Sequence, residues 1–511
     1  MPKVFPDATL TSFSSRPART GRLDAIQRAA WETCPAWLAC AAGLILAVLF
    51  IGYTYPLSFL SGHGEYFEGS DAAQHVTGWL LYVQDAWHFP LTKTGLLNSP
   101  AGVSIAFTDS IPLAALVFKS LRGLLPPGFH YFGGWHALAY LGQGAGAVAL
   151  VRALGVRHLA GAVAAAAFAL MWPPLLHRMG HTSLMTHGVL LFALAAYFAG
   201  CRQTLSVRAA GGLLIALSIA ALAIHPYLFA MCFPICIAFL LDAYVRHAGW
   251  RGAAVMACAA VAGVLALAGL LGYFGHGSTV TDGFGAYSMN LASPFCGGRL
   301  ALCEGMKDAA QGEGLNYFGG GLLLLLPLAA WMAVQRRSLP IRRHAALAVV
   351  LIGMALYALS NQVYAGHAHL LTYPLPAAAQ WITGTFRASG RFFWPVGYLV
   401  MGLVVATVLR RPSWPVLALV AGALGLQWFD TASWRDYDRS LAAKPSKADL
   451  AAWQPLMAGV ERISLYPVFG CGNFDAESYV FFQRLAARYG MPMNTGYVAR
   501  PGADCRAERQ P

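Results

Sequence analysis

The chain has 511 residues, of which 57% are hydrophobic and only 11% are charged, and its formal net charge is +13. Soluble proteins carry roughly twice that share of charged residues, so the composition indicates a polytopic membrane protein. A basic protein that binds nucleic acid places its charge on a water-exposed domain. Here the charge lies between apolar runs, which excludes nucleic acid as a partner.

Eleven windows are apolar enough over roughly 17 to 25 residues to cross a bilayer. One long run is divided at His225–Pro226, because proline starts or breaks a helix. The fold class predicted is an all-α polytopic membrane protein with a transmembrane domain over residues 36–429. The windows are 36–59, 131–151, 158–175, 183–200, 208–224, 227–244, 253–274, 318–335, 344–360, 392–409 and 414–429.

The charge distribution predicts the orientation of these spans. With a cytoplasmic N-terminal segment over 1–35, the inner side holds the whole net charge of +13, while acids and bases balance outside. This agrees with the positive-inside rule. Eleven spans then place the C-terminus on the periplasmic or extracytoplasmic side of the inner (plasma) membrane. The first span lacks a cleavage site and is expected to stay as an anchor.

The longest loops all lie on the outer side, at about 60–130, 275–317 and 361–391. They are followed by an outer tail over 430–511, in which strand-like stretches flank a helical one. The tail is short and carries no catalytic motif, so we expect a small α/β domain that docks on the outer loops.

Four cysteines fall on the outer side, where an oxidising compartment favours disulfides. Cys296 and Cys303 bracket a short segment, and Cys471 and Cys505 are the only two cysteines of the tail. The sequence therefore predicts one disulfide within each pair.

The first outer loop is the richest in polar residues. From residue 70 to 87, apolar side chains recur at helical spacing, which predicts an interfacial helix with tryptophan anchors. Asp71 starts this helix, and His75 follows one turn later on the same face. An acid beside the lipid headgroups is suited to removing a proton from an acceptor hydroxyl. The alternative is that Ser70 or Asp71 only caps the helix.

A second interfacial helix is expected to follow Asp109, with Pro112 in its first turn and Lys119 on its polar side. Asp109 is a candidate catalytic acid, although its position also fits a helix cap. Lys119 is a candidate ligand of a substrate phosphate.

Three further arginines and a histidine are candidate substrate-binding residues at span mouths. Arg387 and Arg391 lie four residues apart, so their guanidinium groups could hold a phosphate, or they could extend to the interface as ordinary anchors. Arg178 and His181 lie between the third and fourth spans. They could line a polar cavity or, with Asp71, take part in a metal site.

These features together resemble the GT-C superfamily of integral-membrane glycosyltransferases. The resemblance rests on Gly69-Ser70-Asp71 directly after the first span, on two interfacial helices, on the number of spans and on the outer C-terminal appendage. It implies a polyprenyl-phosphate-linked sugar donor, a lipid or glycan acceptor among the membrane lipids and polysaccharides, and Asp71 as the base. The Trp-Trp-Asp signature of oligosaccharyltransferases is absent, which argues against a peptide acceptor.

The resemblance leaves the cofactor open. Metal-using relatives carry adjacent acids at this position, whereas Ala72 follows Asp71 here. Only Glu68 or Asp109 could complete such a pair, so a divalent metal is possible and no ligand set is assigned.

The sequence thus predicts an inverting glycosyltransferase, transferring a hexose or a pentose at the outer leaflet. Two alternatives remain open. A transporter or flippase for a lipid-linked saccharide would need charged groups along a path through the spans, and mid-depth acids are scarce. A non-catalytic scaffold of an envelope glycan assembly would lack a deep outer cavity joining Asp71 to Arg387.

Overall fold

A computed structural model describes residues 33–274, 283–336, 341–447, 450–472, 475–500 and 505. Nearly all of the predicted cytoplasmic segment 1–35 lies outside these residues. Within them the protein is mostly helical, and every predicted apolar window carries a helix. These helices are α2 (Ala36–Thr54), α6 (Phe132–Ala153), α7 (Leu159–Leu170), α9 (Gly188–Cys201), α10 (Val207–Ile224), α11 (Pro226–Phe239), α12 (Val245–Leu270), α13 (Gly320–Gln335), α14 (Ala345–Leu359), α16 (Trp394–Val408) and α17 (Trp414–Asp430).

Fewer than eleven of these helices are long and apolar enough to count as membrane spans. Six helical stretches of the described chain are long and apolar enough, or seven if the bent pair α17 and α18 (Ala432–Ala442) is one span. Helices α7 and α13 are apolar but shorter. The protein is therefore a multi-pass membrane protein, and the number of eleven spans stays a prediction.

The predicted break at His225–Pro226 is present. His225 ends α10, and its ring Nδ1 accepts the backbone N–H of Tyr227 in the first turn of α11 at 3.1 Å. The helical stretch that continues through a π-turn at 240–244 into α12 breaks at Gly249, whose φ of 77° is non-helical. Glycine tolerates this left-handed backbone without steric cost.

Hydrogen bonds join the short basic turns at one end of the bundle. Arg202 donates to the carbonyl of Leu154 at 2.8 Å, and Arg336 donates to the carbonyl of Thr407 at 3.3 Å. At the same end, the N–H of Cys34 bonds the carbonyl of Arg157 at 3.0 Å. The arginine-bearing turns assigned to the inner side therefore lie together, which agrees with the predicted alternation of the spans.

At the other end of the bundle, the first loop contains α3 (Leu57–Leu60), the 3-10 turn η1 (Glu65–Glu68), α4 (Ser70–Gln84) and α5 (Pro112–Ser120). The two predicted helices are thus present, but α4 is not a lipid-facing anchor. Trp79 is fully buried, and its indole N–H donates to the carbonyl of Phe129 at 2.7 Å. The prediction of tryptophan anchors is wrong at Trp79, because the tail and the loop after α5 cover the helix.

Two antiparallel hairpins complete the loops on this side. Strand β1 (Lys93–Thr94) pairs with β2 (Val103–Ser104), and β3 (Gln362–Ala365) pairs with β4 (Ala368–Thr372). The second and third outer loops also contain short turns that carry functional side chains. These are η6 (Ala309–Gly314), α15 (Gln380–Thr385) and η9 (Ser389–Phe393), with α8 (Pro173–Leu176) between α7 and α9.

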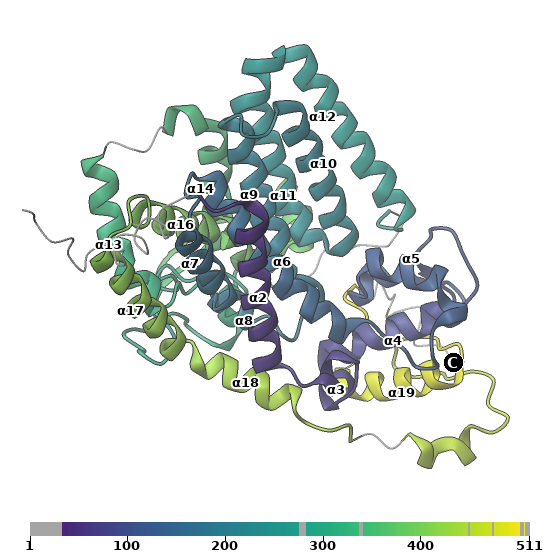
Figure 1. Ribbon diagram of the computed structural model, residues 1–511. Coiled ribbons are helices and arrows are strands. Elements are labelled where there is room, and N and C mark those ends of the chain that lie inside the picture. The colour runs from purple at the N-terminus through teal and green to yellow at the C-terminus, as the bar shows by residue number, and fades with distance from the viewer. Residues whose placement is uncertain are drawn as a thin grey trace, which may run out of the picture.

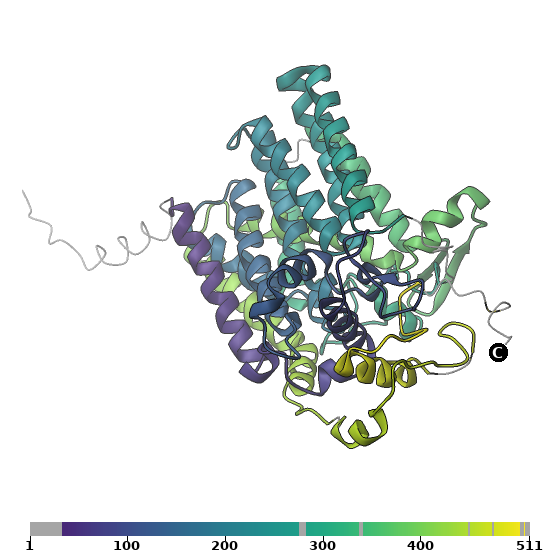
Figure 2. The ribbon, with the colours of Figure 1, turned by 90° about the vertical axis from the view of Figure 1, so that its right-hand side faces the viewer.

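The tail docks on the first loop, as expected. Helix α19 (Ala476–Tyr489) lies beside α4 at one end of the bundle (Figures 1 and 2). Glu477 accepts the N–H of Ser70 at 2.7 Å and so caps the start of α4. The expected strands are reduced to isolated bridges of Met493 with Leu97 and with Ile463. The tail therefore forms a helix and extended segments rather than an α/β sheet of its own.

Both predicted disulfides are present, between Cys296 and Cys303 and between Cys471 and Cys505. The second one ties the segment before α19 to the chain that follows Arg500.

Candidate active site

Asp71 does not cap its own helix. Its carboxylate instead accepts the hydroxyl of Tyr497 on one oxygen and lies 3.2 Å from Nδ1 of His181 on the other. The preceding Ser70 has a φ of 53°, a left-handed conformation that is costly for a residue with a side chain. Such backbone concentrates at functional sites, where the surrounding structure holds it. The capping alternative for Asp71 is therefore wrong.

Tyr497 reaches Asp71 from the tail. Burial and the carboxylate of Asp71 raise the pKa of the phenol, so Tyr497 stays protonated and donates its hydrogen bond at neutral pH. The N–H of Tyr497 is itself held by Gln483 of α19 at 2.9 Å. The position of the catalytic candidate is thus set partly by the C-terminal segment.

His181 continues the chain of contacts to Glu313. Its Nε2 lies 3.4 Å from one oxygen of Glu313, whose other oxygen accepts from Arg178 and Arg391 at 2.5 Å each. Burial alone would raise the pKa of Glu313, but the two guanidinium groups outweigh it and hold the pKa well below its usual range. Glu313 is therefore a carboxylate at neutral pH that fixes the ring of His181.

The close approach of two turns explains how Glu313 meets Arg391. Glu313 belongs to η6 and Arg391 to η9, and Asn316 donates to the carbonyl of Gly390 at 2.9 Å. A side chain at Gly390 would meet the Cα atom of Gly314 at 2.3 Å. Glycine at position 390 allows this contact, which brings Arg391 to Glu313.

Asp109 is bound by the histidine at the α10–α11 break. Because Nδ1 of His225 accepts the N–H of Tyr227, the ring proton lies on Nε2, which faces Asp109 at 3.3 Å. Burial would raise the pKa of Asp109, but His225 outweighs it and the net shift is downward. Asp109 does not cap α5, because the N-cap residue of this helix is Ile111 and no side chain caps it.

His75 lies fully buried on α4, one turn after Asp71. Burial lowers the pKa of its ring to about 4, against the opposing effect of Asp109 and Asp71 nearby, so the ring is neutral at pH 7. Neither ring nitrogen has a hydrogen-bond partner among the described residues. We define the residues that gather here as the acid–histidine cluster: Asp71, His75, Asp109, His181, His225 and Glu313.

Solvent reaches the acids of the cluster but not the arginines behind them. The side chains of Asp71 and Glu313 are 26% and 25% exposed, whereas those of Arg178 and Arg391 are 3% and 10% exposed. Asp71 is therefore open to solvent, while Arg178 and Arg391 are covered and pair with Glu313.

Of the two predicted phosphate-binding arginines, Arg387 lies beside the cluster, close to Tyr497. Its guanidinium lies 5.4 Å from the ring of Tyr287. Arg500 of the tail lies nearby and donates to the carbonyl of Thr385 at 3.0 Å. Burial and the neighbouring Arg387 cation lower the pKa of Arg500.

Lys119 lies apart from the cluster. Its ammonium donates to the carbonyl of Ala86 at 3.0 Å and stacks on the ring of Tyr82, 3.7 Å from the ring centre, with Trp87 beyond. These contacts tie α5 to the end of α4. The geometry brings Lys119 to no residue of the cluster.

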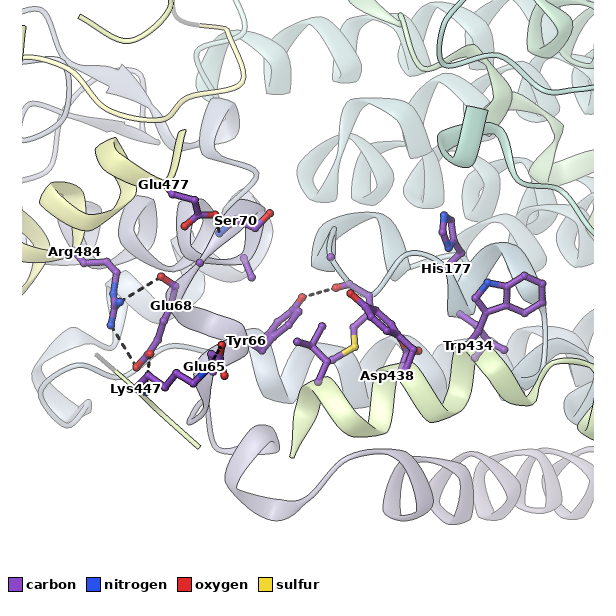
Figure 3. Close-up of a pocket in the computed structure, with 17 residues that line it drawn as sticks. Glu65, Tyr66, Glu68, Ser70, His177, Trp434, Asp438, Lys447, Glu477 and Arg484 are labelled. Atoms are coloured by element: carbon purple, nitrogen blue, oxygen red, sulfur yellow. Dashed lines mark hydrogen bonds and ion pairs between the residues drawn. The ribbon is translucent and has the colours of Figure 1, made fainter. Parts of the chain in front are cut away.

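A cavity of about 810 Å³ opens where α4 begins. Ser70, the neighbour of Asp71, lines it (Figure 3). Gly180, the neighbour of His181, also lines it. Glu68 also lines it, but its carboxylate is bound to the tail through Arg484 at 3.4 Å and so does not complete a pair with Asp71. The other polar lining residues include Glu65, His177, Asp438, Lys447 and Glu477.

The described part of the chain contains no group of three or more His, Cys, Asp or Glu side chains arranged to hold a metal ion. In the acid–histidine cluster, one oxygen of Asp71 faces a ring nitrogen of His181, and one oxygen of Asp109 faces a ring nitrogen of His225.

Comparison with known families identifies the chain. A family model described as a domain of unknown function, DUF6311, matches residues 44–432, and a model of the DUF6311 C-terminal domain matches residues 452–511. The chain belongs to the DUF6311 family. The comparison with curated proteins gives no match.

Among solved structures, this DUF6311 protein shares its fold with the arabinofuranosyltransferase AftD from Mycobacteria. The TM-score is 0.54 at 15% identity, over 86% of this chain and 30% of AftD, so the chain spans less than a third of that protein. An oligosaccharyltransferase from Archaeoglobus fulgidus, tethered to an acceptor peptide, matches at a TM-score of 0.47 and 12% identity, over 89% of this chain and 64% of the other. The likeness to AftD agrees with the predicted GT-C-like architecture at the level of the fold alone.

Sequence reasoning missed four residues of the DUF6311 site. Glu313 lies in a long loop without a motif, and Tyr497 and Arg500 lie in a tail that was expected only to dock. His225 was used as a helix boundary. The one signal that could have marked His225 as a site residue is its place before a helix-starting proline at the outer end of a span.

Proposed function

We propose that the protein is a membrane glycosyltransferase that moves a sugar from a polyprenyl-phosphate-linked donor to a lipid or polysaccharide acceptor at the outer leaflet. The observation that carries the proposal is the state of Asp71. Its carboxylate caps no helix, is oriented by Tyr497 and His181, and is still 26% exposed. The fold shared with an arabinofuranosyltransferase supports the same class of reaction.

In this proposal Asp71 is the general base. It takes the proton of an acceptor hydroxyl as that oxygen attacks the anomeric carbon from the face opposite the phosphate. The bond between the anomeric carbon and the phosphate oxygen breaks, the polyprenyl phosphate leaves, and the anomeric centre is inverted. Tyr497 and His181 are positioning residues, because each bonds one oxygen of Asp71 and so fixes the direction of the remaining lone pairs.

The leaving phosphate needs stabilisation of negative charge more than a general acid. Arg387 and Arg500 support this role, since both lie on the tail side of the cluster near Tyr497 and Asp109. Arg391 was the expected partner of Arg387, but its Nε and Nη2 already donate to Glu313, which also accepts from Arg178. We therefore assign binding of the donor phosphate to Arg387 and Arg500. Arg391 holds Glu313, which in turn orients His181.

The cavity beside Ser70 supplies a place for the acceptor. Its lining of carboxylates, a histidine and two cations suits the hydroxyl groups of a glycan, and Ser70 adjoins the proposed base. A bound hydroxyl could thus reach Asp71 while the donor occupies the arginine side of the cluster.

The test is an assay of the purified protein in lipid nanodiscs. Polyprenyl-phosphate-linked pentoses and hexoses are offered together with membrane lipid and glycan extracts, and both the glycosylated product and free polyprenyl phosphate are measured. The proposal expects both products in equal amounts. Movement of the donor across a vesicle membrane without either product would indicate a transporter, and neither event with any donor would favour the scaffold.

A further inference from the structure

A second cavity lies at the end of the bundle opposite the acid–histidine cluster. It measures about 970 Å³ and lies among α9, α14, α16 and the turns that join them. We call it the basic cavity, because five arginines line it: Arg202, Arg246, Arg336, Arg343 and Arg410.

Within the described chain, the carboxylates around the cavity are too few to balance this charge. None of the five arginines forms an ion pair there, and Asp242 is the single acid of the lining. Both oxygens of Asp242 are already occupied: one accepts the N–H of Ala346 at 3.0 Å, and the other accepts the hydroxyl of Tyr197 at 2.7 Å and the N–H of Leu347 at 2.9 Å. The cavity therefore keeps a net positive charge.

Hydrogen bonds to backbone hold three of the arginines around the opening. Arg202 bonds the carbonyl of Leu154, Arg336 that of Thr407, and Arg246 that of Arg343 at 2.8 Å. Each uses one guanidinium nitrogen for this bond. A planar guanidinium matches the geometry of a phosphate.

The wall of the cavity beyond the arginines is apolar. Phe198 of α9, Leu347 and Leu351 of α14, and Leu399 and Leu403 of α16 form it. These helices lie in stretches long and apolar enough to cross a membrane, so the apolar wall is part of candidate membrane spans. A small free anion would contact the arginines but would leave these apolar side chains uncovered.

We propose that the basic cavity binds the phosphate headgroup of an anionic membrane lipid, with the lipid chain against the apolar wall. The positive-inside rule accounts for arginines on this face, but not for five of them around one cavity. The proposal does not depend on glycosyl transfer at the opposite end. The lipid is either an ordinary anionic phospholipid or a polyprenyl phosphate, which share the phosphate and the apolar chain.

The test compares two triple variants that remove the same charge from the same face. Arg246, Arg343 and Arg410 are changed to Gln in the first, and Arg251, Arg342 and Arg411, which do not line the cavity, are changed to Gln in the second. Binding of phosphatidylglycerol, a polyprenyl phosphate and zwitterionic phosphatidylcholine to the full protein is measured by native mass spectrometry. Size-exclusion profiles confirm that both variants fold.

The first variant is expected to lose about a hundredfold in affinity for the two anionic lipids, since each arginine near a membrane contributes roughly a factor of five. The second is expected to bind like the unchanged protein. A tenfold preference for polyprenyl phosphate would identify the carrier lipid as the ligand, and equal binding would identify bulk phospholipid. Equal losses in both variants, or displacement of lipid by an equal concentration of inorganic phosphate, would overturn the proposal.

Discussion

Replacing Glu313 with Gln tests the contacts that orient the proposed base. The carboxylate of Glu313 accepts from Arg178 and Arg391 and faces His181, and an amide cannot serve all three. If the NH₂ group of the new Gln faced the two guanidinium groups, donors would meet donors. If it faced His181 instead, the contact with the ring of His181 would change. Both arginines are buried, so they would lose the anion that compensates them.

The expected loss in free energy of unfolding is about 3 kcal/mol, at the low end for breaking a buried ion pair, because the side chain of Glu313 is 25% exposed. Unfolding by sodium dodecyl sulfate in mixed micelles measures it. Glu65→Gln is the matched control: its partner Lys447 is 69% exposed, so the loss should be at most about 1 kcal/mol.

A double-mutant cycle with Arg391→Gln then isolates the pair. If Glu313→Gln destabilised the protein no more than Glu65→Gln, the two arginines would not depend on Glu313 and the support assigned to His181 would fail.

Three further predictions concern pH, the tail and the packing of α4. The pKa of Glu313 is depressed in the folded protein, so the stability that its carboxylate contributes is complete above the ordinary pKa of 4.5 and is lost as the pH falls below it. The thermal stability of the unchanged protein should therefore converge on that of Glu313→Gln as the pH is lowered from about 5 to strongly acidic values. Tyr497→Phe should lower kcat about tenfold with KM for the donor nearly unchanged, in a transfer assay, because it removes one hydrogen bond from Asp71; an unchanged kcat would remove Tyr497 from the site. Gly78→Ala should destabilise the protein by about 1–3 kcal/mol, since the new methyl group would lie 2.1 Å from Oγ1 of Thr108. The control Gly134→Ala has open space around it and should leave the stability unchanged. Equal unfolding curves for the two variants would show that helix α4 can shift to make room.

The sequence predicted features that depend on local chemistry. The apolar windows located the helices, His225–Pro226 marked a helix boundary, and both cysteine pairs follow from short spacing or from being alone in the tail. The prominence of Asp71 also came from local context, namely an acid at the start of a helix just after the first span.

The remaining features depend on contacts between distant segments. Glu313 is 242 positions from Asp71 and meets it only through His181. The burial of Trp79 depends on the loop at Phe129, and its amphipathic neighbours alone indicated a membrane surface. Arg391 fits a phosphate by spacing with Arg387, but only the fold reveals that Glu313 pairs with its guanidinium group.

The most direct test of the account is the rate of glycosyl transfer by Asp71→Asn. The amide keeps the shape of the side chain and can still accept from Tyr497, so folding and donor binding should be nearly unchanged while kcat falls by about a hundred- to ten-thousand-fold. Asp436→Asn, at an exposed ion pair, is the control and should keep full activity. Near-normal transfer by Asp71→Asn in purified, folded protein would contradict the assignment of Asp71 as the base and direct the search to Asp109.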